Sequence, residues 1–360
     1  MNTARISKIV SVVGVISLAV AAPPTHPVEA APPNPDIALK TGLWHAWLHS
    51  PGGELPFDLD IEAEDGKYRV WIINGEERIE IPRVTFLGGE LVLDIDYYDS
   101  KISAYCDPSG SQLLGVWIKQ GRGDKKTGMR FQASAGAAPR FKPIKAKSPA
   151  AKSIEGKWEV KFASSKEPAI AVFEQRSDGT ASGTFLTTTG DYRYLAGRID
   201  GDRLRLSGFD GAHAFLFDAR VKEDGTLAGD FWSRDTWHDT WTAKRNAGAV
   251  LPDSFALTKS VDGKSFAELS FPDLDGRVRS LGDPEFAGKA RIIEIFGTWC
   301  PNCNDATKYM VELHQKYGSR GLKIIGLAFE LTGDPVRDAR QVRIYVQSHA
   351  IEYPVLIAGT

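Results

Sequence analysis

The chain has 360 residues, and its 44 Lys and Arg against 46 Asp and Glu give a formal net charge of -2. At about 100 to 200 residues per domain, this length predicts two or three domains. A near-neutral chain lacks the excess of basic residues that binding to nucleic-acid phosphates requires, so we expect proteins or small molecules as partners and no nucleic acid.

The first 30 residues have the order of a secretory signal peptide. Arg5 and Lys8 precede an uncharged apolar run from Ile9 to Ala22, and small-residue cleavage sites occur around Ala19 to Ala22 and at Ala30. This run is shorter than the roughly 20 residues that a membrane-spanning helix needs. We therefore expect a signal peptide at 1–30, no stable membrane span after its cleavage, and a protein exported to the periplasm or another extracytoplasmic compartment.

Residues 36 to 246 carry the pattern of antiparallel β structure. Short runs that alternate apolar and polar residues, such as LVLDIDY and AFLFDARV, are separated by turns roughly every ten residues. The pattern is duplicated. A Gly-x-Trp opening occurs at 42–44 and again at 156–158, and each is followed at the same spacing by a Gly-x-aromatic triplet, at 115–117 and 229–231.

We therefore predict two related antiparallel β modules, at 36–140 and 154–246, joined by a linker at 141–153 that is rich in Pro, Ala and Lys. Each module could close as a small barrel or pack as a two-sheet sandwich, and the sequence leaves both open. The Gly-x-Trp opening resembles that of lipocalin-like barrels, where a tryptophan plugs one end, and we infer no ligand from it. The aromatic run FWSRDTWHDTW at 231–241 could form a carbohydrate-binding platform, but we expect its tryptophans in the core.

From residue 251 the pattern changes to that of an α/β unit. After a hairpin-like stretch with a turn at Asp275-Gly276, apolar strand-like runs alternate with helical patterns. The expected strands span 291–297, 322–329 and 353–358, and the expected helices span 303–317 and 335–348. This succession predicts a parallel α/β domain at 251–360.

The chain has three cysteines, too few and too unevenly spaced for a disulfide-stapled scaffold. Cys106 ends an expected strand, and we expect it to be a buried small apolar residue. Cys300 and Cys303 form a Cys-x-x-Cys motif where the first α/β strand meets its helix. A zinc site needs about four ligands, and neither a second such motif nor suitably spaced histidines accompany this one. A structural clip is disfavoured because the closed loop is too short to restrict the unfolded chain, which leaves redox chemistry.

The residues around the motif meet the needs of a redox pair. We expect Cys300 at the N-cap of the helix and Pro301 at its first position. The free N–H groups there favour thiolate over thiol and lower the pKa of Cys300 below the free value of about 8.5, so Cys300 is the expected nucleophile and Cys303 the resolving thiol. Glu294 interrupts the apolar strand, and burial would raise its pKa so that it can act as the base for Cys303. The alternative is that Glu294 faces a solvated edge or pairs with a lysine.

The stretch EIFGTWCPNC at 294–303, preceded by the arm FPDLDG at 271–276, resembles the extracytoplasmic thioredoxin-like thiol-disulfide reductases of the TlpA/ResA type. In that family the Trp-Cys-x-x-Cys motif carries the redox cysteines, here with Trp299 and Pro301 supporting it, and Glu294 matches the buried proton acceptor. The resemblance implies reduction of protein disulfides outside the cytoplasm. It further implies a disulfide-containing protein substrate, an upstream thiol electron donor, and no metal or cofactor besides the redox-active Cys300–Cys303 disulfide.

The sequence departs from this family at its end. Thioredoxin folds continue with a cis-proline strand facing the cysteines, a further strand and a closing helix, whereas this chain stops at Thr360. We do not assign Pro354 the cis-proline role, and we expect a thioredoxin-like domain that lacks its C-terminal part. Two other functions stay open. One is a peroxiredoxin-like antioxidant enzyme, which fits poorly because its peroxidatic cysteine lacks the adjacent tryptophan and the Cys-x-x-Cys pair. The other is a non-enzymatic exported binding protein that uses its β modules.

Overall fold

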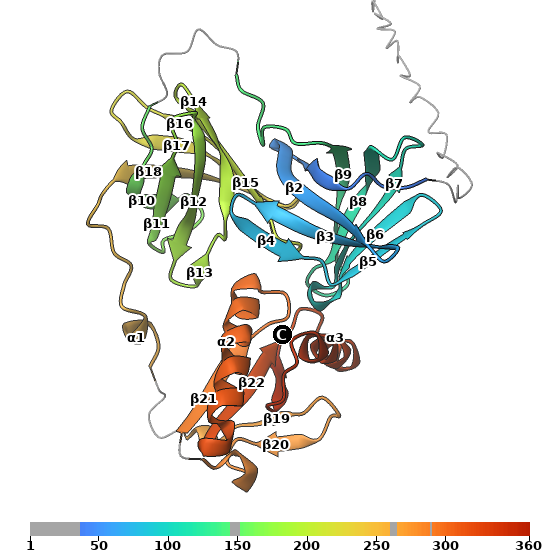
Figure 1. Ribbon diagram of the computed structural model, residues 1–360. Coiled ribbons are helices and arrows are strands. Elements are labelled where there is room, and N and C mark those ends of the chain that lie inside the picture. The colour runs from blue at the N-terminus through green and yellow to red at the C-terminus, as the bar shows by residue number, and fades with distance from the viewer. Residues whose placement is uncertain (1–36, 145–151, 260–264, 289) are drawn as a thin grey trace, which may run out of the picture. The chain divides into compact units, whose positions relative to one another are not determined.

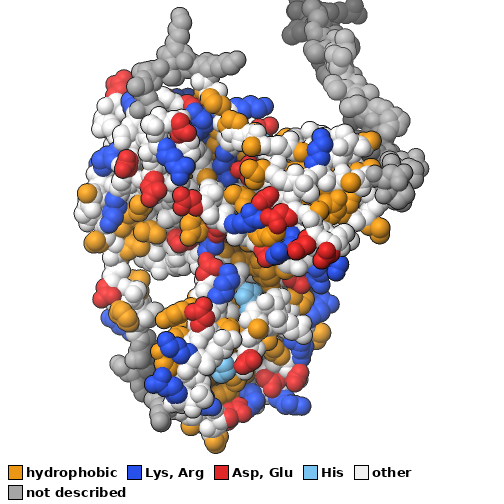
Figure 2. All heavy atoms as spheres, viewed as in Figure 1, with side chains coloured by type: hydrophobic (Ala, Val, Ile, Leu, Met, Phe, Trp, Pro, Cys, Tyr) orange, Lys and Arg blue, Asp and Glu red, His pale blue; other side chains and the backbone are white. Residues whose placement is uncertain are grey.

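The computed structural model describes residues 37–144, 152–259, 265–288 and 290–360 (Figure 1). The expected signal peptide lies outside these residues, and so do positions 145–151 of the expected linker. The described residues fall within one compact unit. They form two antiparallel sheets of nine strands each, a two-stranded hairpin and a three-stranded parallel sheet, which confirms the predicted combination of β and α/β structure. On the face shown in Figure 2, basic and acidic side chains are interspersed.

The first sheet consists of β1 (Gly42–Ser50), β2 (Gly53–Glu64), β3 (Lys67–Asn74), β4 (Glu77–Glu80), β5 (Arg83–Leu87), β6 (Glu90–Ile95), β7 (Ser100–Cys106), β8 (Gln112–Gln120) and β9 (Lys126–Ala135). It is an open half-barrel with strand order β4-β3-β2-β1-β9-β8-β7-β6-β5, so β4 and β5 are its two edges. Along β1, the alternate residues Trp44, Ala46 and Leu48 are buried, as a strand with one face in the core requires. A short 3-10 helix, η1 (Asp96–Tyr98), follows β6.

The second sheet consists of β10 (Gly156–Phe162), β11 (Ala169–Gln175), β12 (Thr180–Thr187), β13 (Gly190–Asp191), β14 (Leu195–Asp200), β15 (Arg203–Phe209), β16 (Ala214–Val221), β17 (Leu227–Ser233) and β18 (Trp237–Arg245). It closes into a barrel because β11 pairs with both β10 and β12. The indole of Trp158 donates to the carbonyl of Ile154 at 2.7 Å, and that of Trp44 donates to the carbonyl of Lys40 at 2.9 Å. The shared four-residue offset supports the predicted duplication.

The open side of the first sheet is filled by the β15–β16 hairpin of the barrel. The ring of Phe209 packs against Phe57, with 4.5 Å between ring centroids, and against Trp117 at 5.2 Å. The Asn74 amide donates to the carbonyl of Phe209 at 2.8 Å and accepts from its N–H at 3.1 Å. This hairpin covers the open side of the first sheet with the apolar ring of Phe209, and its backbone forms hydrogen bonds with the buried Asn74 amide. The first sheet is therefore covered although its two edge strands do not pair with each other.

The α/β region contains α1 (Ser254–Leu257), η2 (Phe266–Glu268), β19 (Ser270–Pro272), β20 (Val278–Ser280), η3 (Pro284–Phe286), β21 (Ala290–Phe296), α2 (Pro301–Tyr317), η4 (Gly318–Arg320), β22 (Leu322–Phe329), α3 (Pro335–Ser348) and β23 (Val355–Gly359). Its parallel sheet has the order β21-β22-β23, which confirms the predicted alternation. Asp334 caps α3, because its carboxylate accepts from the N–H groups of Val336 and Arg337. None of the described helices is long and apolar enough to cross a membrane.

Candidate active site

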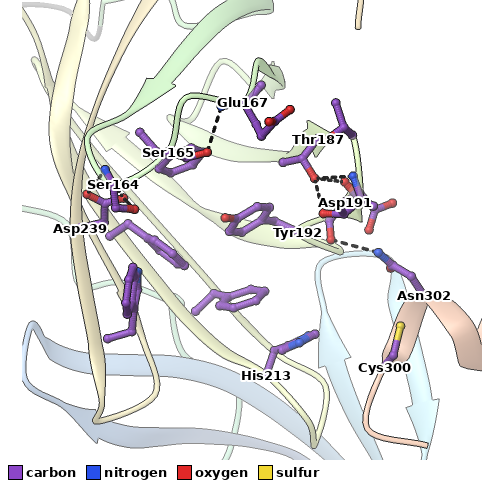
Figure 3. Close-up of a pocket in the computed structure, with 18 of the residues that line it drawn as sticks. Ser164, Ser165, Glu167, Thr187, Asp191, Tyr192, His213, Asp239, Cys300 and Asn302 are labelled. Atoms are coloured by element: carbon purple, nitrogen blue, oxygen red, sulfur yellow. Dashed lines mark hydrogen bonds between the residues drawn. The ribbon is translucent and has the colours of Figure 1, made fainter. Parts of the chain in front are cut away.

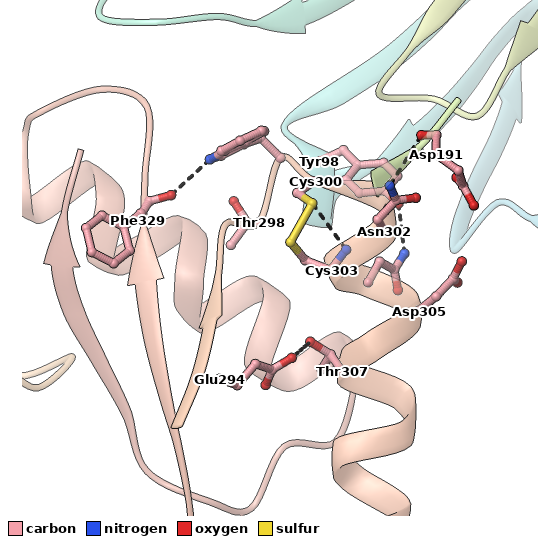
Figure 4. The surroundings of a disulfide bond; sticks show 12 residues. Tyr98, Asp191, Glu294, Thr298, Cys300, Asn302, Cys303, Asp305, Thr307 and Phe329 are labelled. Atoms are coloured by element: carbon pink, nitrogen blue, oxygen red, sulfur yellow. Dashed lines mark hydrogen bonds between the residues drawn. A yellow bond between two sulfur atoms is a disulfide. The ribbon is translucent and has the colours of Figure 1, made fainter. Parts of the chain in front are cut away.

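The two cysteines of the motif lie at the junction of β21 and α2 and form a disulfide, with their Cα atoms 5.2 Å apart (Figure 4). Cys300 is the N-cap of α2, and its sulfur accepts a hydrogen bond from the N–H of Cys303 at 3.2 Å. Pro301 occupies the first helical position. The predicted cap is therefore confirmed, and the Cys300 sulfur faces the unpaired N–H groups that begin the helix.

Glu294 lies on β21 and is 8% exposed. Its two carboxylate oxygens accept hydrogen bonds from the hydroxyls of Thr307 and Tyr353, each at 2.9 Å. Burial raises the pKa of Glu294, although the two hydroxyl donors act in the opposite direction. Thr307 lies one helical turn beyond Cys303, so the carboxylate contacts the face of α2 that carries the second cysteine. The alternative of a solvated edge is thus wrong.

Hydrogen bonds and one ring-stacking contact connect Thr307 with α3 and the first β module. The Tyr345 hydroxyl donates to Thr307 at 3.0 Å, and the Tyr345 ring stacks on His349 with 4.1 Å between centroids. The Nε2 atom of His349 lies 2.7 Å from the side-chain amide oxygen of Asn304. The side-chain amide nitrogen of Asn304 donates in turn to the Tyr98 hydroxyl at 2.9 Å. The sequence alone did not indicate these partners, because they come from three separate segments of the chain.

A second buried carboxylate lies behind the motif. Glu330 directly follows β22, is 4% exposed, and accepts hydrogen bonds from the N–H of Thr298 at 3.0 Å and from its hydroxyl at 2.8 Å. Burial raises the pKa of Glu330 to about 7. The sequence could have indicated Glu330 as a candidate site residue, because it directly follows a predicted strand and ligands of open α/β sheets bind at the carboxyl ends of the strands. Glu330 therefore fixes the backbone two residues before Cys300.

The tryptophan of the motif is held against the end of the neighbouring strand. The Trp299 indole donates to the carbonyl of Phe329 at 2.9 Å, while the side chain remains 38% exposed. Gly297 permits this close approach, because a Cβ at that position would lie 2.7 Å from the same carbonyl oxygen. Trp299 thus combines a fixed orientation with an accessible face beside Cys300.

Cys300 lines a cavity of about 540 Å³ that the end of the barrel completes (Figure 3). The barrel contributes an aromatic wall made of Phe162, Tyr192, Phe215, Phe231 and Trp237. The side chain of Asn302 donates to the carbonyl of Asp191 across this cavity at 3.3 Å. Trp237 is 52% exposed, so the expectation that it packs in the core is wrong: it is the first residue of β18 and lies at the barrel rim, whereas Trp241 is buried as expected.

Cys106 lies apart from this cavity, at the end of β7. It is 9% exposed, and burial raises the pKa of its thiol to about 11. These properties confirm the predicted buried thiol, and a protonated thiol of this kind is a weak nucleophile. The structure thus brings together Cys300, Cys303, Trp299 and Pro301, and Glu294 of β21 contacts Thr307, one turn of α2 beyond Cys303.

Comparison with known proteins gives partial matches. No family model matches the chain. The thiol-disulfide oxidoreductase ResA of Bacillus thuringiensis is 33% identical over 95 residues, which cover 26% of this chain and 50% of that protein. The thioredoxin-like protein YneN of Bacillus subtilis is 25% identical over 96 residues, 27% of this chain and 53% of that protein. A solved thioredoxin-family thiol:disulfide interchange protein from Chlorobium tepidum is 28% identical over 28% of this chain and 63% of its own, with a TM-score of 0.22.

The chain spans about half the length of the curated relatives that it matches. The sequence matches confirm the predicted resemblance to thioredoxin-like thiol-disulfide oxidoreductases over about a quarter of the chain. The thiol-disulfide oxidoreductases among the curated relatives and the Cys300–Cys303 disulfide both indicate thiol-disulfide exchange.

Proposed function

We propose that the protein is a thiol-disulfide oxidoreductase that reduces protein disulfides outside the cytoplasm. The observation that carries this proposal is a cysteine pair at the N-terminus of α2 whose first member lines an open cavity. The order of the first 30 residues, which is that of an export signal, supports the location. A dithiol has a function there because disulfides persist outside the cytoplasm.

The reaction needs only the two cysteines and the substrate disulfide. In the dithiol form, the Cys300 thiolate attacks one sulfur of the substrate, the substrate S–S bond breaks, and its other sulfur leaves as a thiolate. Cys303, once deprotonated, attacks the sulfur of Cys300, which forms the Cys300–Cys303 disulfide and releases the second substrate thiolate. Two electrons pass to the substrate, and an external dithiol donor must restore the dithiol form.

The geometry favours Cys300 as the nucleophile. Its sulfur receives the Cys303 N–H at the positive end of α2, which stabilises a thiolate. Cys300 also lines the cavity beside the barrel, while Cys303 is the third residue of α2, three positions further along the chain, and is not among the residues that line that cavity. A substrate disulfide that enters the cavity therefore meets Cys300 first.

Glu294 is the proposed proton acceptor for Cys303. Burial raises the pKa of Glu294, which makes its carboxyl group a better proton acceptor than an exposed carboxylate. Its contact with Thr307, one turn from Cys303, directs it toward the resolving thiol rather than toward solvent. The hydroxyls of Thr307 and Tyr353 hold both carboxylate oxygens in place.

The test is the reduction of insulin by the dithiol form of the purified protein. We expect turnover with the wild type and with Cys106→Ser, because Cys106 is buried away from the cavity, and complete loss with Cys300→Ser. Full activity of Cys300→Ser would contradict the proposal. Absence of turnover in every form, with insulin and with a small aromatic disulfide, would contradict it equally.

A further inference from the structure

A second cavity, of about 600 Å³, adjoins the motif, and Trp299 and His213 line both cavities. The two differ in charge. The first is lined by the carboxylates of Glu167, Asp191 and Asp239 and by no Lys or Arg. The second is lined by no carboxylate and by five cationic side chains, those of Lys119, Arg122, Lys125, Lys126 and Arg234.

The cations of the second cavity lack anionic partners within the part of the chain that the structure describes. Lys119 is 3% exposed, and its ammonium donates to the carbonyl of Tyr98 at 2.8 Å, a neutral group. The Nε of Arg234 is buried without a hydrogen-bond partner. Burial lowers the pKa of Lys119 to about 8, and the positive charge of Arg234 acts in the same direction. The more distant carboxylates of Asp99, Asp210 and Glu330 act in the opposite direction without forming an ion pair with Lys119. A buried and a half-buried cation thus lie together with no paired carboxylate among the described residues, and an anion in the cavity would stabilise both.

The loop between β8 and β9, which carries Arg122 and Lys125, is held in a fixed shape. The side-chain amide of Gln120 donates to the carbonyls of Gly121, Gly123 and Lys125, at 3.1, 2.7 and 2.9 Å. The N–H of Gly123 donates to the carbonyl of Leu331 at 2.8 Å, which anchors the loop beside the end of β22.

The one carboxylate of this loop does not neutralise the cavity. Asp124 lies 3.5 Å from the guanidinium of Arg337 and does not line the cavity. Arg337 of α3 also lies 3.8 Å from Asp99, so both carboxylates already pair with this guanidinium. Cations that pair with no carboxylate of residues 37–144, 152–259, 265–288 and 290–360 form a site that an external carboxylate stabilises, through charge-assisted hydrogen bonds.

We propose that this cavity binds an acidic side chain of the polypeptide substrate, close in sequence to the disulfide that Cys300 attacks. The proposal rests on the proposed function and specifies its substrate class. Because Cys300 lines the first cavity and not the second, a ligand that fills the cationic cavity and reacts at Cys300 extends past the indole of Trp299. A polypeptide has this reach, whereas a small disulfide fits within the first cavity.

The experiment compares peptide disulfides that differ at one residue, placed three positions from the reactive cysteine and carrying Glu, Gln or Lys. One set has this residue before the cysteine and a second set has it after. We expect kcat/KM for reduction by the dithiol form to be about fivefold higher with Glu than with Gln in one of the sets, and lowest with Lys. The preference should shrink as NaCl is raised from about 50 to about 500 mM.

Two surface variants show whether the cavity produces this preference. Arg122→Gln with Lys125→Gln removes two exposed cations of the cavity, and we expect the ratio of Glu to Gln peptides to fall below about twofold. Lys161→Gln with Lys244→Gln removes two exposed cations of the barrel that do not line the cavity, and the ratio should stay as in the wild type.

Equal kcat/KM for the three peptides in both sets would overturn the inference while leaving the oxidoreductase intact. A Glu preference that survives the double substitution at Arg122 and Lys125 would overturn it as well. Failure of all the peptides, together with insulin, is a different result, since it would remove the proposed function itself.

Discussion

Replacing Glu330 by Gln removes the ionisable group that holds Thr298 in place, and the structure sets the size of the effect. The folded pKa of Glu330 is about 7 against an ordinary value of 4.5. Between these two pH values the folded protein keeps a proton that the unfolded chain releases, so the free energy of unfolding falls as pH rises through this window. At 1.36 kcal/mol per pKa unit, the wild type loses about 3 kcal/mol from this group between pH 4.5 and pH 8.

Glu330→Gln is spared this loss. Its amide oxygen can still accept from the Thr298 N–H, while the Thr298 hydroxyl can rotate to accept from the new NH₂ group. The free energy of unfolding of the variant, relative to that of the wild type, should therefore rise by about 2 to 3 kcal/mol from pH 5 to pH 8. The assay is urea unfolding at both pH values, followed by tryptophan fluorescence and by circular dichroism, whose coincidence justifies a single free energy.

The control for this experiment is Glu268→Gln, which removes an exposed carboxylate from the same region of the chain. It should follow the pH dependence of the wild type. If Glu330→Gln and the wild type lose stability in parallel between pH 5 and pH 8, then Glu330 ionises normally in the folded protein, and its assignment as a buried carboxyl group that holds the motif is refuted.

Three further predictions concern the base, the module contact and the aromatic wall. Glu294→Gln should slow resolution of the mixed disulfide by about a hundredfold in quenched single turnovers, while alkylation of Cys300 by iodoacetamide is unchanged; an unchanged resolution rate would count against the base. Phe209→Ala should cost about 3 to 5 kcal/mol of stability in urea, because its ring fills the open side of the first sheet, and a cost below about 1 kcal/mol would show that this contact is absent. Trp237→Ala should raise the KM for insulin about two- to fivefold, whereas Tyr105→Ala, equally exposed at 52% but outside the cavity, should not; equal KM values in the two variants would exclude the aromatic wall from binding.

Local chemistry in the sequence was enough to predict the redox motif and its immediate surroundings. A proline at the first helical position fixes where α2 begins, so the position of Cys300 as its cap follows from neighbouring residues alone. The same holds for the strands and helices of the α/β region, whose apolar periodicity is strong. A lone acidic residue within an apolar strand also indicated that Glu294 is buried.

Features that depend on distant segments were not predictable in this way. The contact between Thr298 and Glu330 joins the ends of two strands, and periodicity carries no information about which side chains meet there. The same limit applies to the architecture of the β modules, because the hairpin carrying Phe209 decides that the first sheet stays open. Trp237 was misassigned since alternation gives the face of a strand but not whether its end lies at a rim.

The most direct test of the central claim is to trap the mixed disulfide. A Cys303→Ser variant cannot resolve the mixed disulfide. After reaction with two peptides joined by a disulfide, one of the two peptides should therefore remain attached to the protein through its cysteine. Peptide mapping by mass spectrometry should place the adduct on Cys300, and Cys300→Ser should form none. An adduct on Cys106, or no adduct in Cys303→Ser, would contradict Cys300 as the nucleophile of a thiol-disulfide oxidoreductase.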